Sequence, residues 1–76
     1  MKLEFAYDKL RGRIKERFGT QDRFADALNI SRTTLSQKLN NATEFTQTEM
    51  LTAMSALGED LSAVDSYFFT LVDRKS

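Results

Sequence analysis

The side chains best suited to bind a partner lie between Ser31 and Asn41, where hydroxyls, amides and cations follow one another. No carboxylate occurs from residue 27 to residue 43. A helix that only faces water usually mixes Glu with its Lys and Arg, whereas this combination of side chains hydrogen-bonds base edges and phosphates. We therefore expect a DNA-binding surface. Its candidate residues are Gln21, Ser31, Arg32, Thr33, Thr34, Ser36, Gln37, Lys38, Asn40 and Asn41.

These residues have different expected roles. Bidentate contact with a base suits Arg32 and Gln37, while we predict that Lys38 and Asn41 mainly contact phosphates. The methyl group of Thr33 can pack on a thymine methyl, or the residue can simply begin a helix. Two helices joined by a short turn also occur in proteins that never bind DNA, so the spacing alone leaves both interpretations open.

Two short helical patterns, residues 21–28 and 32–39, must position this surface. Their apolar residues recur at the helical period, which marks an inner face on each. These inner residues are Phe24, Ala25, Leu28, Leu35 and Leu39. Between the helices, Asn29 can adopt the left-handed conformation that ends a helix, Ile30 can plug the corner, and Ser31 can cap the next helix. The sequence thus predicts a helix-turn-helix.

Three further helices are predicted around this unit. The first runs from about Tyr7 to Arg17 and ends at Gly19, and Thr20 is the expected cap of the helix that follows. A capping box, Thr46-Gln47-Thr48-Glu49, opens a helix that continues through Leu57. A short fifth helix is expected over roughly 62–67, with Ser62 or Asp60 as its cap. With 76 residues and no linker, the chain is expected to form one all-α domain of about five helices.

The segment Tyr67 to Val72 is unusually apolar for the end of a chain. Its apolar residues are Tyr67, Phe68, Phe69, Leu71 and Val72. Some of these side chains can complete the core, with Phe68 or Tyr67 the best suited. The rest can form an exposed patch, or a short strand that pairs with its copy in a homodimer. Such a dimer would place two recognition helices in successive turns of one DNA face.

Composition narrows the possible functions. The chain has 11 Lys plus Arg and 11 Asp plus Glu, but residues 1–41 hold nine cations and five acids, a net of +4, and residues 42–76 hold two cations and six acids, a net of −4. The predicted helix-turn-helix lies in the basic half, as nucleic-acid binding requires. The chain has no His and no Cys, so we expect no enzyme activity, metal or other cofactor. No apolar run has membrane-spanning length, and a cytoplasmic protein is expected.

The chain also resembles the phage repressor family of Cro/CI-type helix-turn-helix domains, which have a small lambda-repressor-like fold. The resemblance covers about residues 7–66. The positions that carry it are Gln21, Phe24, Ala25, Leu28, Ile30, Leu35 and Leu39. One departure is Asn29, where the family most often has Gly, although Asn tolerates the same backbone conformation. The phrases Arg32 to Ser36, Lys38 to Asn40 and Ser66 to Phe69 look more narrowly like small phage Cro-like proteins.

The resemblance implies a sequence-specific regulator that acts as a homodimer on a double-stranded DNA operator in a bacterial host cell. It implies that residues matching Arg32, Thr33, Ser36 and Gln37 contact bases and that those matching Gln21 and Asn40 contact the backbone. Some relatives instead modulate repression at a lysis–lysogeny switch. An alternative function is therefore a protein-binding modulator that sequesters, or binds together with, a second phage repressor.

Overall fold

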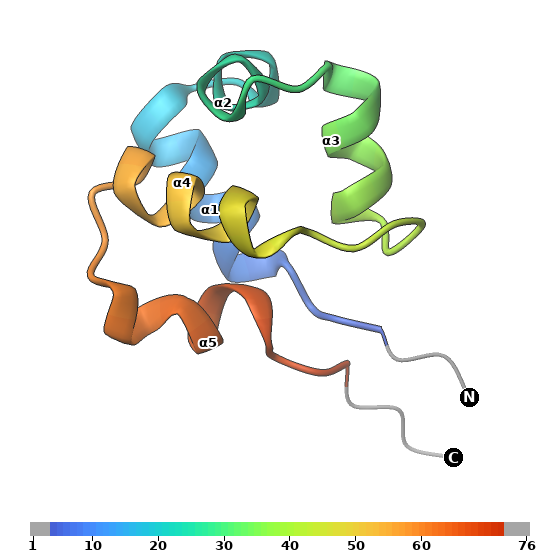
Figure 1. Cartoon of the computed structure of the whole chain (residues 1–76), viewed down its shortest axis with the longest axis vertical. Helices are drawn as coiled ribbons and strands as arrows, with labels where there is room; N and C mark the ends of the chain where they lie inside the picture. Colours follow the sequence, from blue (N-terminus) through green and yellow to red (C-terminus); the bar gives the residue numbers. More distant parts are fainter. Residues whose placement is uncertain (1–3, 73–76) are drawn as a thin grey trace.

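The computed structural model describes residues 4–72, which form a small helical bundle (Figure 1). The elements in this range are α1 (Asp8–Phe18), α2 (Gln21–Leu28), α3 (Arg32–Leu39), α4 (Gln47–Ala56), the 3-10 helix η1 (Leu61–Ala63) and α5 (Val64–Phe68). Helices α1, α2 and α4 pack together, and α5 packs across α1 and α4. The predicted all-α class and the five predicted helices are confirmed.

The core is built from the apolar stripes that the sequence pattern indicates. Its largest fully buried side chains are Phe24, Phe68, Leu10, Ile14, Leu35, Met54 and Leu57. Aromatic rings close one end of the core, where Phe45 contacts both Tyr7 and Phe68 with ring centroids 5.4 and 5.0 Å apart. These contacts join the start of α1, the segment before α4 and the end of α5 into one cluster.

The corner between α2 and α3 has the predicted helix-turn-helix form. Asn29 has φ 60° and ψ 41°, the left-handed conformation, and its N–H bonds to the Ala25 and Asp26 carbonyls. The Ser31 hydroxyl accepts the Thr34 N–H at 3.0 Å and caps α3. In Figure 1, α3 stands at one side of the bundle, beyond the corner. The end of α2 follows from the tolerance of Asn for the left-handed conformation, and the start of α3 follows from the preference of Ser for the N-cap position.

The ends of the described chain lie side by side, and this pairing differs from the expected one. Phe5 and Leu71 form an antiparallel β-bridge, in which Ala6 N–H bonds to the Thr70 carbonyl at 2.7 Å and Val72 N–H bonds to the Glu4 carbonyl at 3.0 Å. We name residues 4–6 and 70–72 the terminal ribbon. The sequence suggested a C-terminal strand that pairs with its copy. Within one chain the nearer partner is the extended N-terminal lead, which α5 brings alongside.

The ends of α1 and α5 also differ slightly from the predicted bounds. Tyr7 precedes α1 as its N-cap residue, with its side chain in the core cluster, and α1 extends to Phe18. The fifth helix is divided: Asp60 caps the short η1, and α5 continues to Phe68. The capping box of α4 is present as predicted, with Thr46 and Glu49 bonded reciprocally.

Candidate functional site

The outer face of α3 carries polar side chains that a partner could reach. Thr33, Gln37 and Asn40 are exposed, and Ser36 is half-buried. Leu35 and Leu39 are 0% and 3% exposed and hold the opposite side of the helix in the core. The helix thus presents short polar groups outward, as its sequence pattern predicts. Contact of these residues with DNA stays a prediction.

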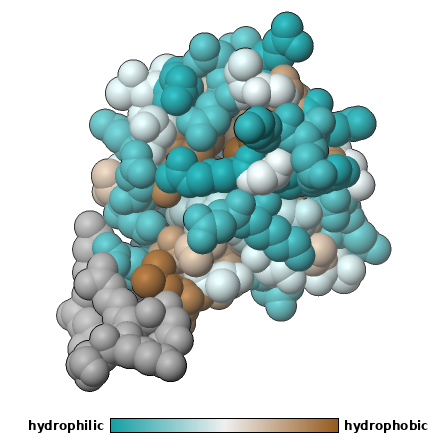
Figure 2. All heavy atoms as spheres, turned by 180° about the vertical axis from the view of Figure 1, so that it is seen from behind, coloured by the Kyte–Doolittle hydropathy of each residue, from teal (hydrophilic) through white to brown (hydrophobic). Residues whose placement is uncertain are grey.

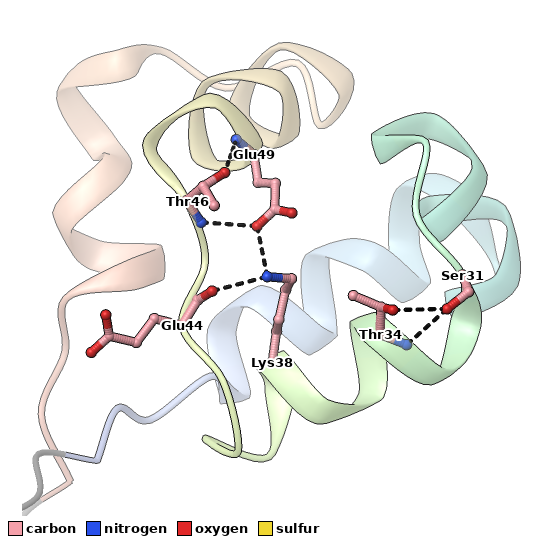
Figure 3. A network of polar contacts seen from close by, with 6 residues as sticks. All are labelled: Ser31, Thr34, Lys38, Glu44, Thr46 and Glu49. Atoms are coloured by element: carbon pink, nitrogen blue, oxygen red, sulfur yellow. Dashed lines mark hydrogen bonds and ion pairs between the residues drawn. The ribbon is translucent and has the colours of Figure 1, made fainter.

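Lys38 does not lie on this outer face. It belongs to a polar network between α3 and the start of α4 (Figure 3). Its ammonium group donates to the Glu44 carbonyl at 2.9 Å and lies 3.0 Å from Glu49 Oε1. The two paired side chains are only 9% and 17% exposed. Glu49 Oε1 also accepts the Thr46 N–H at 2.8 Å as part of the capping box. Lys38 therefore ties α3 to the cap of α4.

This position does not match the exposed one that contact with phosphate requires. The Lys38 Cα lies on the α3 side that faces α4, and Glu49 offers the ammonium group a carboxylate there. Burial alone raises the pKa of the Glu49 carboxyl, but hydrogen bonds from the Thr46 backbone and from Lys38 outweigh it, so the pKa lies below its usual value. Glu49 is therefore ionised at neutral pH and balances the buried cation.

Asn40 and Asn41, at the end of α3, are likewise engaged within the chain. The Asn41 amide pairs with both main-chain groups of Phe5: its Oδ1 accepts the Phe5 N–H at 2.8 Å, and its Nδ2 donates to the Phe5 carbonyl at 2.9 Å. Arg11 donates to the Leu39 carbonyl at 3.0 Å and to Asn40 Oδ1 at 3.2 Å. Asn41 thus holds the N-terminal segment, and only Asn40 keeps an exposed side chain.

Other cations that the sequence places in the basic half are also used internally. Arg13 donates to the Leu57 carbonyl and pairs with Glu59 at 2.9 Å. Arg17 donates to the Ala56 carbonyl at 3.4 Å. The Arg32 guanidinium lies 3.4 Å from Asp22 Oδ1. These contacts were not predicted, because their partners are backbone carbonyls and acids that are remote in the sequence.

The remaining predicted residues lie around the corner. Ser31 caps α3, and its hydroxyl also donates to the Thr34 hydroxyl at 2.9 Å, so both residues hold the helix start. Gln21 is half-buried at the start of α2, and it lines a shallow depression with Arg11 and Lys15. The structure therefore places Thr33, Ser36, Gln37 and Asn40 on the outer face of α3, Gln21 at the start of α2, and Lys38 away from that outer face.

The apolar C-terminal segment divides between core and surface. Tyr67 and Phe68 are 5% and 2% exposed and belong to the core, so they are not available to a second chain. Phe69, Leu71 and Val72 are 50%, 53% and 40% exposed. Phe69 packs edge-on against Phe5, with ring centroids 6.2 Å apart. Figure 2 shows hydrophobic surface gathered at this end of the molecule, while most of the face in view is hydrophilic.

Two further observations bear on the class of protein. Among residues 4–72, no three His, Cys, Asp or Glu side chains cluster in a way that could hold a metal ion. None of the helices in that range is long and apolar enough to cross a membrane.

Comparison with known proteins identifies a family and a similar solved structure. The model of the family described as "Protein of unknown function (DUF739)" matches residues 3–71. The solution structure of the modulator of repression (MOR) of the temperate bacteriophage TP901-1 from Lactococcus lactis is similar, with a TM-score of 0.75 and 37% sequence identity. The match covers 86% of this chain and 88% of that chain. No curated protein matches the chain.

Proposed function

We propose that the chain, which belongs to the DUF739 family, is a phage regulatory protein that modulates repression by binding a repressor protein. The similarity to a phage modulator of repression, over most of both chains, supports this function. In this proposal the chain is not an enzyme and needs no cofactor. Its partner is a second, DNA-binding protein of the same phage, and it acts in the host cytoplasm.

The charge on the α3 face is the observation that favours a protein partner over DNA. The helix has two cations, and Lys38 is buried against Glu49 while Arg32 lies beside Asp22. The whole chain holds 11 Lys and Arg against 11 Asp and Glu, so its net charge is zero. Most of the affinity for DNA comes from cations that neutralise phosphates. A neutral polar face with few free cations suits a protein surface better.

Direct DNA binding is the second candidate function, and the helix-turn-helix geometry favours it. An exposed α3 with Thr33, Gln37 and Asn40 outward can enter a major groove. One such helix gives few base contacts, so this function requires the homodimer that the sequence analysis expected. Both the operator contacts and the homodimer remain predictions.

A titration separates the two functions. The purified chain is added to DNA that flanks its own gene, alone and together with the repressor encoded nearest to that gene. The proposal expects no shift of the DNA by the chain alone, and it expects a direct complex with the repressor, seen by calorimetry. Tight, salt-dependent binding of the chain alone to one DNA sequence, without a repressor complex, would establish direct DNA binding instead.

Gln37→Ala provides the control for direct DNA binding. If the chain binds DNA itself, losing the Gln37 amide should relax sequence preference, because a bidentate base contact contributes about 1–3 kcal/mol of discrimination. The exposed position of Gln37 means that the substitution leaves the core intact. An unchanged preferred DNA site in a folded Gln37→Ala variant would remove Gln37 from the base-contacting residues.

A further inference from the structure

Among residues 4–72, the terminal ribbon has one hydrogen-bonding edge that is covered and one that is open. Phe5 and Leu71 are a non-hydrogen-bonded pair, because the ribbon bonds run from Ala6 to Thr70 and from Val72 to Glu4. The main-chain groups of Phe5 and Leu71 therefore point away from each other. Those of Phe5 meet the Asn41 amide. Those of Leu71 have no hydrogen-bonding partner among residues 4–72.

We propose that the open edge at Leu71 is a docking site for an extended segment of the repressor, which pairs there as an added β-strand. This docking site rests on the proposed function, because it is the surface through which the chain would bind the repressor. In this mode the main-chain hydrogen bonds give affinity, and alternate side chains of the added strand meet the ribbon. An added strand would exchange hydrogen bonds with both Leu71 main-chain groups.

The side chains around the edge fit an apolar strand. Leu71 lies on one face of the ribbon, and Phe69, at the end of α5 with φ −125° and ψ 20°, comes two residues before it, outside the ribbon. Both are half exposed, and the Phe69 ring packs edge-on against Phe5. On the opposite face Val72 is 40% exposed. A strand beside Leu71 would therefore find apolar surface for its side chains on both faces. A two-stranded ribbon is only marginally stable by itself, and a third strand would complete it.

The size of the patch argues against a second copy of this chain as the occupant. A fully covered aromatic side chain buries roughly 150–250 Å², so three half-exposed apolar side chains present on the order of 300 Å². A stable interface between two globular proteins needs about 800 Å² from each partner. The patch is too small for a homodimer that rests on it alone, and it has the size that one strand covers.

The direct test is amide exchange of the whole chain, measured by NMR with and without the repressor encoded nearest to its gene. We expect fast exchange of the Leu71 amide in the chain alone and at least about tenfold slower exchange in the complex. A complex that leaves the Leu71 amide unprotected would overturn the docking site but not the proposed function. Failure of any complex to form would overturn both. Protection in the chain alone, with a doubled mass, would identify a second copy as the occupant and overturn the proposal.

A variant pair tests the hydrogen bond itself. Leu71→Pro removes the outward N–H, while the ribbon bonds donated by Ala6 and Val72 remain. We expect it to weaken repressor binding on the order of tenfold, since a lost donor leaves a carbonyl of the added strand unpaired. Leu71→Thr keeps the N–H and is expected to retain binding within about threefold. If Gln37→Ala abolished binding while Leu71→Pro left it unchanged, the surface would lie on α3 instead.

Discussion

At the scale of single residues, the pair Lys38 and Glu49 shows how one charge can serve the fold instead of a ligand. The cation lies on the helix that the sequence marks as the binding element, but its ammonium group is directed into the bundle. It meets a carboxylate that already caps the next helix. Because both charges are largely withdrawn from water, removing either one leaves the other without its partner.

The substitution Lys38→Met should therefore lower the stability of the fold. The variant keeps the length of the side chain but loses two charge-assisted contacts, so we expect a loss of about 1–3 kcal/mol in the free energy of unfolding. Urea denaturation measures it. Lys15→Met, at an exposed position of α1, is the matched control and should change stability by less than about 0.5 kcal/mol. Equal, small effects of the two substitutions would contradict the structural role of Lys38.

The pKa of Glu49 predicts how stability depends on acid. The folded state holds this pKa below the ordinary value of 4.5, so the ionised form stabilises the fold at neutral pH. That contribution is present above pH 4.5 and is lost as pH falls through the lower, folded-state pKa. Unfolding curves between pH 3 and 6 should show this loss in the native chain. In the Glu49→Gln variant, the free energy of unfolding should change less with pH over the same range. An identical pH dependence in the two proteins would contradict the lowered pKa of Glu49.

At the scale of elements, Asn41 connects the end of α3 to the terminal ribbon. It has φ 64°, a left-handed conformation, and from there its amide covers the edge of Phe5 as a neighbouring strand would. The position of the ribbon is thus linked to the end of α3. The proposed partner surfaces on α3 and on the ribbon therefore lie on the same side of the molecule (Figure 1).

Asn41→Gly should release the N-terminal segment without straining the turn. Because glycine adopts the positive φ freely, the loss in the free energy of unfolding comes from the two hydrogen bonds of the Asn41 amide. We expect a destabilisation of about 1–2 kcal/mol and faster exchange of the Phe5 amide, measured by NMR. Asn41→Ala should be destabilised further, because alanine is strained at this φ. A Phe5 amide that stayed protected in both variants would show that Asn41 is not what holds it.

Leu35→Ala tests how α3 is held in the bundle. Leu35 is 0% exposed, and truncating a buried Leu typically costs about 2–5 kcal/mol. A chain of this length has a total stability of roughly 4–11 kcal/mol. The thermal transition should therefore be greatly lowered or lost. Leu51→Ala, on α4 with its side chain 53% exposed, should melt nearly as the native chain does. A Leu35→Ala variant with native melting would contradict the inward placement.

At the scale of the whole molecule, folding engages part of the cations that give residues 1–41 their net charge of +4. Arg13 and Arg17 bind the end of α4, Arg11 binds the end of α3, and Lys38 is buried. Folding therefore disperses four of the nine cations of the basic half among contacts within the chain. This dispersal, together with the similarity to a modulator of repression, is why we place the protein-binding function ahead of direct DNA binding.

The helices and the corner could be predicted from the sequence because their signals are local. Asn29 and Ser31 end one helix and begin the next, and Thr46 and Glu49 stand three residues apart, as a capping box requires. The apolar period then assigned the inner side of α3, which the burial of Leu35 and Leu39 confirms. Helix positions and inward faces depend on neighbours within one or two turns, so the sequence alone determined them.

Tertiary structure alone decided which polar groups remain free. Lys38 follows the polar pattern of α3, and only the packing of α4 brings Glu49 to its ammonium group. Asn41 and Phe5 are 36 residues apart, and no period in the sequence relates them. The same holds for Phe5 and Leu71, whose pairing leaves one ribbon edge open. Such contacts depend on how whole elements pack, so residue type and spacing could name the candidate side chains but not their partners.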